Sequence, residues 1–381
     1  MILFFLVFFT VYSAVNFYIF IRGWQALSYI PALKPIYAVL FVFSALSYIA
    51  ARTLTVNIPD LLYDILLWTG SLWFAFMLYF FLFIAIIDLS RLLNHIFDIY
   101  PAFIINNYKL TKFITFISVL VVTITVIIAG YLNTRNIKIN YAEINIPRKS
   151  SKINELNAVL VSDFHLTPVN DGKLLKKIVE RINSLNPDIV LMPGDVLDDN
   201  IEILKNRNIA EGLSGIKSKY GVFISNGNHE FIIGVEEADK YLRELGLNVL
   251  RDFAVLIDSS FFVLGREDRS KSNFTDEPRK TLTEVLNGID RNYPVILLDH
   301  TPLQLDDIDK ENIELQLSGH THHGQIFPVN LITSIVYEVS WGYLKKNYSQ
   351  FYVTCGVGTW GPPVRLGSDS EIVNLKIKFV D

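Results

Sequence analysis

The stretch AVLVSDFH, Ala158–His165, is a short apolar run that stops abruptly at an aspartate and a histidine. Such runs, rich in Val, Ile and Leu and bounded by turn residues, are typical of buried strands. The helical pattern LLKKIVERINSL, Leu174–Leu185, follows it and favours an α/β sheet. Four later stretches repeat the arrangement: DIVLMPGD ends at Asp195, GVFISNGNHE at Asn228, His229 and Glu230, PVILLDH at His300, and IELQLSGHTH at His320 and His322.

Residues at the carboxyl ends of neighbouring strands in an α/β sheet converge on one crevice, so five strand ends would share one site. Six of the seven histidines lie at or beside these ends, and only His95 lies elsewhere. Imidazole, carboxylate and amide ligands without a thiolate favour a hydrolytic Mn, Fe, Zn or Mg centre over a structural zinc site. Seven ligands suit two divalent ions about 3.5–4 Å apart that share a bridging carboxylate.

The spacing of these residues agrees with a shared site. Asp163 and His165 are two residues apart, and so are His320 and His322. Side chains two apart in an extended segment face the same way, so each pair should point together. Three glycines would let the backbone turn sharply beside the bulky ligands: Gly194, Gly227 and Gly319.

The ordered motifs SDFH, PGD, GNHE, LLDH and SGHTH resemble the signature of the calcineurin-like metallophosphoesterases. The tail GVGTWGPPVRLGSDSEI resembles their membrane-associated YkuE-like and YaeI-like branch. The resemblance covers Leu156 to the end of the chain and implies a four-layer α/β/β/α sandwich with a dinuclear metal centre. By the same resemblance, Asp163, His165 and His322 would hold one ion, Asn228, His300 and His320 would hold the other, and Asp195 would bridge them.

Such a centre needs no protein nucleophile. A water that bridges two divalent ions loses a proton near neutral pH, and the resulting hydroxide can attack phosphorus in line. His229, which the resemblance places over the leaving group, would donate a proton to the departing alkoxide or stabilise its charge. General-acid catalysis of this kind contributes about 10²- to 10⁴-fold in rate.

The first third of the chain has a different composition. Residues 1–132 hold ten of the 72 Asp, Glu, Lys and Arg residues and no glutamate. Four stretches without charge, each about the length of a spanning helix, predict an integral membrane domain: Met1–Ile21, Pro35–Ala51, Ile65–Ile87 and Phe113–Thr134. The first lacks a basic n-region and an obvious cleavage site, so we expect a permanent anchor and not a signal peptide.

These features predict three segments: a transmembrane helical domain over 1–134, a linker and leading strand over 135–155, and a metallophosphoesterase domain over 156–381. Within the second segment, IKINYAEINI alternates as an exposed strand does, and RKSSKINELN, which runs on into the third, is a polar connection.

The side of the membrane follows from the basic residues. Two loops on one side carry five of them: Arg22, Lys34, Arg91, Lys109 and Lys112. The other side has three basic residues close to the spans, or five if all are counted. The bias favours cytoplasmic loops, with the catalytic domain outside the plasma or inner membrane. Cys355 is the only cysteine, so no internal disulfide reports the compartment.

Several other residues have an expected structural role or leave two alternatives open. We expect His323 to line the pocket rim or meet solvent, Glu230 to orient its loop, and His95 to lie at the membrane interface. Arg365 would meet either a substrate phosphate or a loop carboxylate. The segment Leu331–Asn347 would enter the lipid interface or form a core hairpin. Two acidic residues that follow the bridging position are expected to form a solvated turn: Asp198 and Asp199.

The favoured function is a membrane-tethered, metal-dependent phosphoesterase that acts on phosphoester or pyrophosphate bonds. Its substrate would be a phosphorylated small molecule or, as the tethering favours, a lipid or lipid-linked compound. The resemblance also permits activity of the UDP-2,3-diacylglucosamine hydrolase kind. The alternative is a catalytically silent membrane receptor or scaffold. A transporter is disfavoured because few ionisable residues lie in the spans. A net charge of −4 and the lack of a basic stripe disfavour a nucleic acid partner.

Overall fold

The chain divides into two compact units in the computed structural model, which describes residues 2–54 and 58–381. The first unit runs to Tyr131 and includes Gly361–Val364. The second comprises Leu132–Trp360 and Arg365–Asp381.

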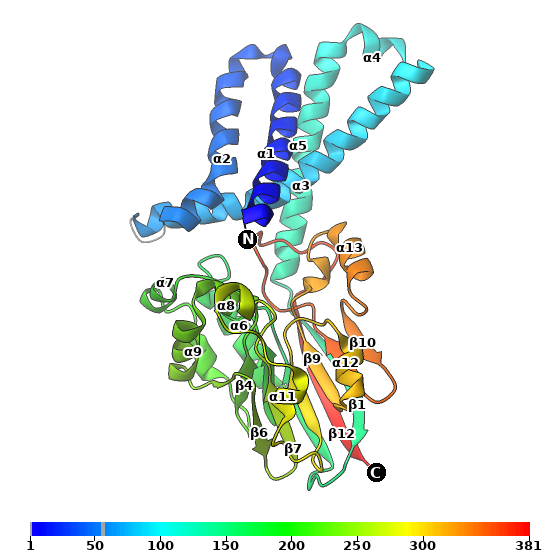
Figure 1. Ribbon diagram of the computed structural model, residues 1–381. Coiled ribbons are helices and arrows are strands. Elements are labelled where there is room, and N and C mark those ends of the chain that lie inside the picture. The colour runs from blue at the N-terminus through cyan, green and yellow to red at the C-terminus, as the bar shows by residue number, and fades with distance from the viewer. Residues whose placement is uncertain (1, 55–57) are drawn as a thin grey trace. The chain divides into compact units, whose positions relative to one another are not determined.

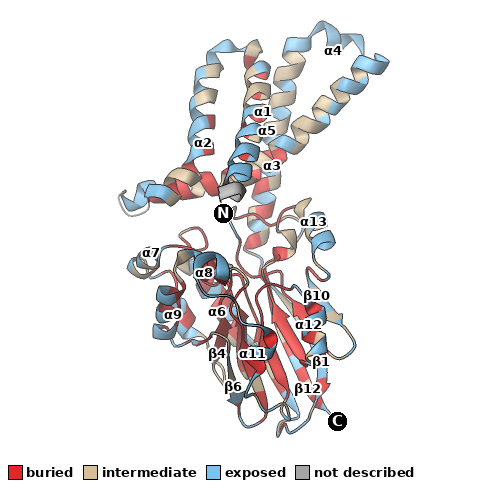
Figure 2. Cartoon of the chain, viewed as in Figure 1, coloured by how far each residue is buried: buried red, intermediate tan, exposed pale blue. Residues whose placement is uncertain are grey.

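The first unit consists of helices (Figure 1), and its long helices are apolar. Its long helices are α1 (Ile2–Ala26), α2 (Lys34–Leu54), α3 (Asp60–Phe97) and α5 (Tyr108–Thr134), with short turns η1 (Leu27–Tyr29), η2 (Pro31–Leu33) and α4 (Ala102–Asn106) between them. Among the described residues, four helical stretches are long and apolar enough to cross a membrane. Many residues of these helices are exposed (Figure 2), and the exposed ones include many large apolar residues, as expected of helices that face lipid.

The second unit contains two six-stranded sheets. The first has the order β1 (Lys138–Pro147), β12 (Glu371–Val380), β2 (Glu155–Leu160), β3 (Ile189–Pro193), β4 (Val222–Ser225), β5 (Asn248–Leu250). The second has the order β10 (Gly342–Lys345), β11 (Gln350–Val353), β9 (Leu315–Ser318), β8 (Val295–Leu298), β7 (Phe261–Gly265), β6 (Phe253–Ile257). Strands β2 to β5 are parallel, as are β7, β8, β9 and β11.

Alternation along each strand builds three apolar layers. Leu160 and Leu298 point into the core between the sheets, while Val159 and Leu297 point outward against helices. Both faces are buried, which explains why these strands are uninterrupted apolar runs. The expected four-layer α/β/β/α sandwich is therefore confirmed.

Helices cover the two outer faces of the sandwich. The helices of the second unit are α6 (Gly172–Ser184), α7 (Ile201–Asn206), α8 (Asn228–Ile233), α9 (Val235–Glu244), α10 (Lys271–Phe274), α11 (Leu282–Leu286), α12 (Leu305–Lys310) and α13 (Val329–Val336), with turns η3 (Glu211–Gly215) and η4 (His322–Gly324). The α6 helix matches the predicted helical pattern, and Asp171 caps its first turn by accepting a hydrogen bond from the Leu174 N–H.

Two structures were expected for the segment Leu331–Asn347: a segment that enters the lipid interface, or a core hairpin. The observed structure has features of both. Its first half lies in α13, which has no buried residue and exposes Ile335 at 85%. Its second half is β10, which forms an antiparallel pair with β11. The segment is thus an edge hairpin strand preceded by an exposed apolar helix.

Candidate metal centre

Five strand ends bring the predicted ligands together, three from the first sheet and two from the second. The site therefore lies across the ends of two sheets and not along the edge of one. Loops after β2, β3, β4, β8 and β9 carry, in that order, Asp163 with His165, Asp195, Asn228 with His229, His300, and His320 with His322.

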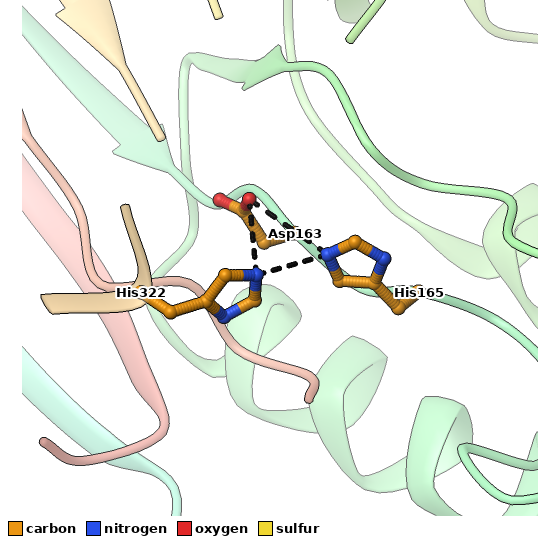
Figure 3. A group of neighbouring side chains, drawn as sticks. All are labelled: Asp163, His165 and His322. Carbon is orange, nitrogen blue, oxygen red and sulfur yellow. Dashed lines mark hydrogen bonds and ion pairs between the residues drawn. The ribbon is translucent and has the colours of Figure 1, made fainter. Parts of the chain in front are cut away.

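Asp163, His165 and His322 form one group (Figure 3). The two Nε2 atoms of the histidines lie 2.9 Å apart, and Asp163 Oδ1 lies 3.5 Å from His322 Nε2 and 3.9 Å from His165 Nε2. All three residues are buried. Two imidazole nitrogens and a carboxylate oxygen thus point at one small volume, as ligands of a shared ion would.

A second group consists of Asp195, His300 and His320. Asp195 Oδ2 lies 3.0 Å from His300 Nε2 and 3.7 Å from His165 Nε2, so the carboxylate reaches both groups. Asn228 Oδ1 lies 3.1 Å from His320 Nδ1, which adds the amide oxygen to the second group. Asp195 therefore occupies the position between two groups that a bridging ligand requires.

Two buried atoms of these groups make no hydrogen bond of good geometry with the described residues: Asp163 Oδ2, and His300 Nε2, which lies 3.0 Å from Asp195 Oδ2 as an ion pair. A buried, unpaired carboxylate oxygen or ring nitrogen costs free energy unless something else satisfies it. A divalent cation satisfies both kinds of atom, and the oxygen and nitrogen donors suit Mn, Fe, Zn or Mg. The residues present therefore fit a pair of such ions.

The histidines control the ionisation of Asp195. Burial alone would raise the pKa of this carboxyl, but the charges of His300, His229 and His165 outweigh burial and hold the pKa well below its usual range. Asp195 is accordingly a carboxylate at any pH near neutrality. An ionised carboxylate is the form that binds a cation.

The backbone of the site differs from the expected one. Residues of the pairs Asp163/His165 and His320/His322 are not extended, so the strand-alternation argument for their convergence is wrong. Left-handed backbone is uncommon for residues other than glycine and costs on the order of 1 kcal/mol or more per residue, which marks a functional constraint. The ligands with such backbone are Asp163 (φ 56°), His165 (φ 44°), Asp195 (φ 54°), His320 (φ 71°) and His322 (φ 47°).

The three motif glycines mainly allow neighbouring atoms of the site to pack close to the backbone. Only Gly194 has a left-handed backbone, with φ 82°. A Cβ at Gly227 would collide with the Asp195 carboxylate, and a Cβ at Gly319 would collide with Asp163 Oδ2 and Ser162 Oγ. The expectation of sharp turns therefore holds at one position, and at the other two the absence of a side chain makes room for a ligand.

Asp198 connects two histidines. Its Oδ1 lies 2.5 Å from His229 Nδ1 and its Oδ2 lies 3.2 Å from His165 Nδ1. Burial would lower the pKa of His229, but Asp198 and Asp195 raise it to about 9, so this ring is cationic near neutral pH. Asp198 and Asp199 are 6% and 1% exposed, so the expected solvated turn is wrong.

Glu230 organises the backbone around Asp195. Its fully buried carboxylate accepts hydrogen bonds from the N–H groups of Val196 (2.7 Å), Gly227 (2.8 Å) and Asp195 (3.0 Å). The loop-orienting role expected for Glu230 is thereby confirmed.

Arg365 fits neither expectation. It is fully buried, and its Nη2 donates to the carbonyls of Cys355 and Gly358, each at 2.7 Å. The same nitrogen lies 3.1 Å from His322 Nδ1. Burial, followed by the charges of His165 and Arg365, lowers the pKa of His322 well below its usual value, which keeps this ring neutral and able to bind metal.

The two remaining histidines lie outside the metal-ligand groups found in the described part of the chain. His323 is partly exposed, with Nδ1 2.9 Å from Ser340 Oγ and its ring 5.8 Å from that of Trp341. His95 lies in the last turn of α3. Sequence patterns missed Asp198, because an aspartate in a polar run shows no sign of its burial.

Comparisons with known proteins agree with this geometry. A sequence profile of the calcineurin-like phosphoesterases matches residues 156–324. An uncharacterized metallophosphoesterase of Aquifex aeolicus is 34% identical over 240 residues, which cover 60% of this chain and 88% of that protein. An uncharacterized metallophosphoesterase of Helicobacter pylori is 34% identical over 228 residues, covering 58% of this chain and 60% of that protein.

A Danio rerio protein named transmembrane protein with metallophosphoesterase domain is 31% identical over 271 residues, covering 68% of this chain and 62% of that protein. The chain thus spans less than two thirds of the length of the Helicobacter and Danio proteins. The resemblance drawn from the motifs is confirmed.

Proposed function

The chain belongs to the calcineurin-like metallophosphoesterase family, and from this premise we propose that it is a membrane-tethered enzyme that hydrolyses phosphoester or pyrophosphate bonds with two divalent metal ions. One observation carries the proposal: Asp195 lies within reach of both His165 and His300, so two ligand groups share one ionised carboxylate. A stable fold without catalysis needs no such arrangement of buried, unpaired ligand atoms.

The two ions would be held by different residues of this chain. Asp163, His165 and His322 would hold one, Asn228, His300 and His320 the other, and Asp195 both. When bound, such ions lower the pKa of a shared water and neutralise the phosphoryl oxygens. The protein keeps His322 neutral and Asp195 ionised for this purpose.

His229 would act on the leaving group. Asp198 holds its Nδ1 at 2.5 Å, so Nε2 is the nitrogen free to donate a proton. The raised pKa of about 9 supplies that proton near neutral pH. A positioned general acid of this kind assists departure of an alkoxide.

We assign the substrate to the lipid or lipid-linked class because of α13. This helix starts seven residues after His322 and exposes Leu331, Ile332 and Ile335 at 55%, 58% and 85%. The ring of Tyr337, the residue after α13, lies 6.2 Å from that of His320. An exposed apolar helix beside a catalytic site suits entry into the surface of a bilayer, from which a lipid-linked phosphate can reach the metals.

The α13 assignment is tested with Ile335→Asp in the full-length protein. We expect this variant to retain activity on a soluble aryl phosphate and to lose activity on vesicle-embedded substrates. Phe253→Asp, at an apolar β6 residue that is 61% exposed, is the matched control and should retain both. Equal activity of Ile335→Asp and wild type on vesicles would remove the support that α13 gives to a lipid substrate.

The enzymatic proposal is tested with full-length protein in detergent, Mn²⁺ and bis(p-nitrophenyl) phosphate. We expect metal-dependent hydrolysis that Asp195→Asn abolishes. His323→Asn is the matched control, because His323 shares the left-handed backbone of its neighbours, which asparagine tolerates, but lies outside the ligand groups. Bound metal in full stoichiometry without turnover on phosphodiesters, phospholipids, nucleotide-linked lipids or prenyl pyrophosphates would favour a silent scaffold.

We further propose that the protein resides in the plasma or inner membrane with its second unit outside the cytoplasm. The support is the five basic residues in the two loops on the other side of the four candidate spans, because basic loops are retained in the cytoplasm.

A further inference from the structure

A cavity of about 380 Å³ lies within the helical unit, between α1, α2, α3 and α5. Its walls are mainly apolar and include Ile19, Phe41, Trp73 and Phe116. The volume lies within the range of about 300–1,000 Å³ that is usual for ligand sites. All its lining residues belong to the first unit, so the cavity is separate from the metal centre.

One wall of the cavity continues onto the outer surface of the helices. Leu33, Ile36 and Leu40 line the cavity and are 38%, 59% and 60% exposed. In helices that span a bilayer, this outer surface faces lipid chains. An alkyl chain can therefore enter the cavity sideways from the membrane.

Charged side chains line one end of the cavity. Arg22 of α1 lies 2.7 Å from Asp88 Oδ2, and Arg91 lies 3.1 Å from Asp88 Oδ1, so one carboxylate serves two guanidinium groups. Lys112 of α5 also lines the cavity. Arg22 and Lys112 each lie about one turn from a helix end, which in a helix that spans a bilayer is about the depth where headgroups meet the hydrocarbon.

These charges leave a positive excess at that end, because three cations face one carboxylate. Across residues 2–54 and 58–381, no carboxylate lies within ion-pair distance of Lys112, and its ammonium lies 5.1 Å from the centre of the Tyr108 ring. The Arg91 guanidinium lies 5.9 Å from the same ring. Unbalanced charge at a membrane helix is costly, and an anion placed between Arg91 and Lys112 would offset it.

We propose that this cavity binds an anionic phospholipid of the surrounding bilayer, with one acyl chain between the helices and the phosphate between Arg91 and Lys112. The apolar cavity matches the chain, and the cationic end matches a headgroup with net negative charge. The inference does not depend on the proposed enzymatic function.

The test uses full-length protein in a neutral detergent, titrated with phosphatidylglycerol or phosphatidylcholine. Native mass spectrometry counts bound lipid, and thermal unfolding reports stabilisation. We expect phosphatidylglycerol to bind and raise the Tm more than phosphatidylcholine does. Lys112→Gln should weaken phosphatidylglycerol binding about fivefold, the effect of one basic residue at an anionic surface.

Two matched controls separate a site from general attraction. Lys109→Gln removes the same charge from an exposed position on α5 outside the cavity and should leave binding unchanged. Ser44→Phe fills the cavity and should abolish binding, whereas Ser118→Phe, at an exposed serine outside it, should not. Equal binding of the two lipids, or equal losses in the two lysine variants, would overturn the proposal.

Discussion

Asp198 holds two rings of the site by their Nδ1 atoms, those of His229 and His165. A carboxylate in this position fixes both ring orientations and leaves both Nε2 atoms facing the centre. We predict that Asp198→Asn lowers kcat about 10- to 100-fold with little change in the thermal unfolding temperature. Asp290→Asn, in a surface turn of the same unit, is a control that should keep full activity. Wild-type kcat in Asp198→Asn would show that the two rings need no such support.

Gly319 makes room for the Asp163 side chain, because it has no side chain of its own. A methyl group there would collide with the Asp163 carboxylate, so we predict that Gly319→Ala weakens metal binding at least tenfold, measured by metal content after dialysis. Gly215→Ala is the matched control, because its Cβ would meet Val179 Cγ1 at an ordinary 3.6 Å. Equal metal content in the two variants would contradict the close-approach argument.

At single residues, the sequence indicated the ligands but, apart from Glu230, not the residues that support them. His300 and Asp195 were identifiable because each ends a buried strand run, and that signal is local. Asp198 and Arg365 act through contacts with residues 31 to 43 positions away, which no local pattern contains. The left-handed backbone of the ligands was also invisible, since even aspartate and histidine, which are enriched in this region, adopt it at only a small fraction of positions.

Among the elements, Glu267 connects three parts of the second unit. Glu267 follows β7. It accepts a hydrogen bond from Arg251 beyond β5 and forms an ion pair with Lys271 of α10. Burial would raise the pKa of Glu267, but Lys271 and Arg251 outweigh it and lower the pKa. A lowered folded-state pKa means that the ionised carboxylate stabilises the fold above its ordinary pKa of 4.5, and that this stability is lost as pH falls through the folded value.

We therefore predict that Glu267→Gln destabilises the second unit near pH 7 by about 1.5–3 kcal/mol, the usual range for hydrogen bonds to a charged group. The difference from wild type should shrink as the pH falls below 4.5. Thermal unfolding at several pH values measures both effects. Glu180→Gln, at an exposed position on α6, should match wild type throughout. A deficit that persists unchanged in acid would exclude the ionic origin.

The ends of strands and helices were predictable only where a single signal, such as the end of an apolar run, marks them. The strands that carry ligands end where apolar runs end, and α6 matches its amphipathic pattern. The charge-free stretch Ile65–Ile87 marks the apolar part of α3, but the helix runs from Asp60 to Phe97, because charged residues continue a helix without difficulty. For Leu331–Asn347, hydropathy could not separate a lipid-facing helix from a buried strand.

For the whole molecule, membrane sidedness decides which substrates can reach the metals. The loops on the Arg22 side carry more basic residues, which favours a cytoplasmic position for them and an outer position for the second unit. Cys355 is the only cysteine and is buried, so wild-type protein gives low background in thiol labelling. Single cysteines can therefore be placed on either side of α5.

We predict that Ser272→Cys, at an exposed position in the second unit, reacts with a membrane-impermeant maleimide in intact cells. Asn107→Cys, exposed just before α5, should react only after permeabilisation, because a spanning helix separates the two positions. The reverse pattern would place the metal centre in the cytoplasm while leaving the four-span topology intact. Labelling of both in intact cells would instead show that α5 does not cross the membrane, since two exposed thiols on one side require the chain to return between them.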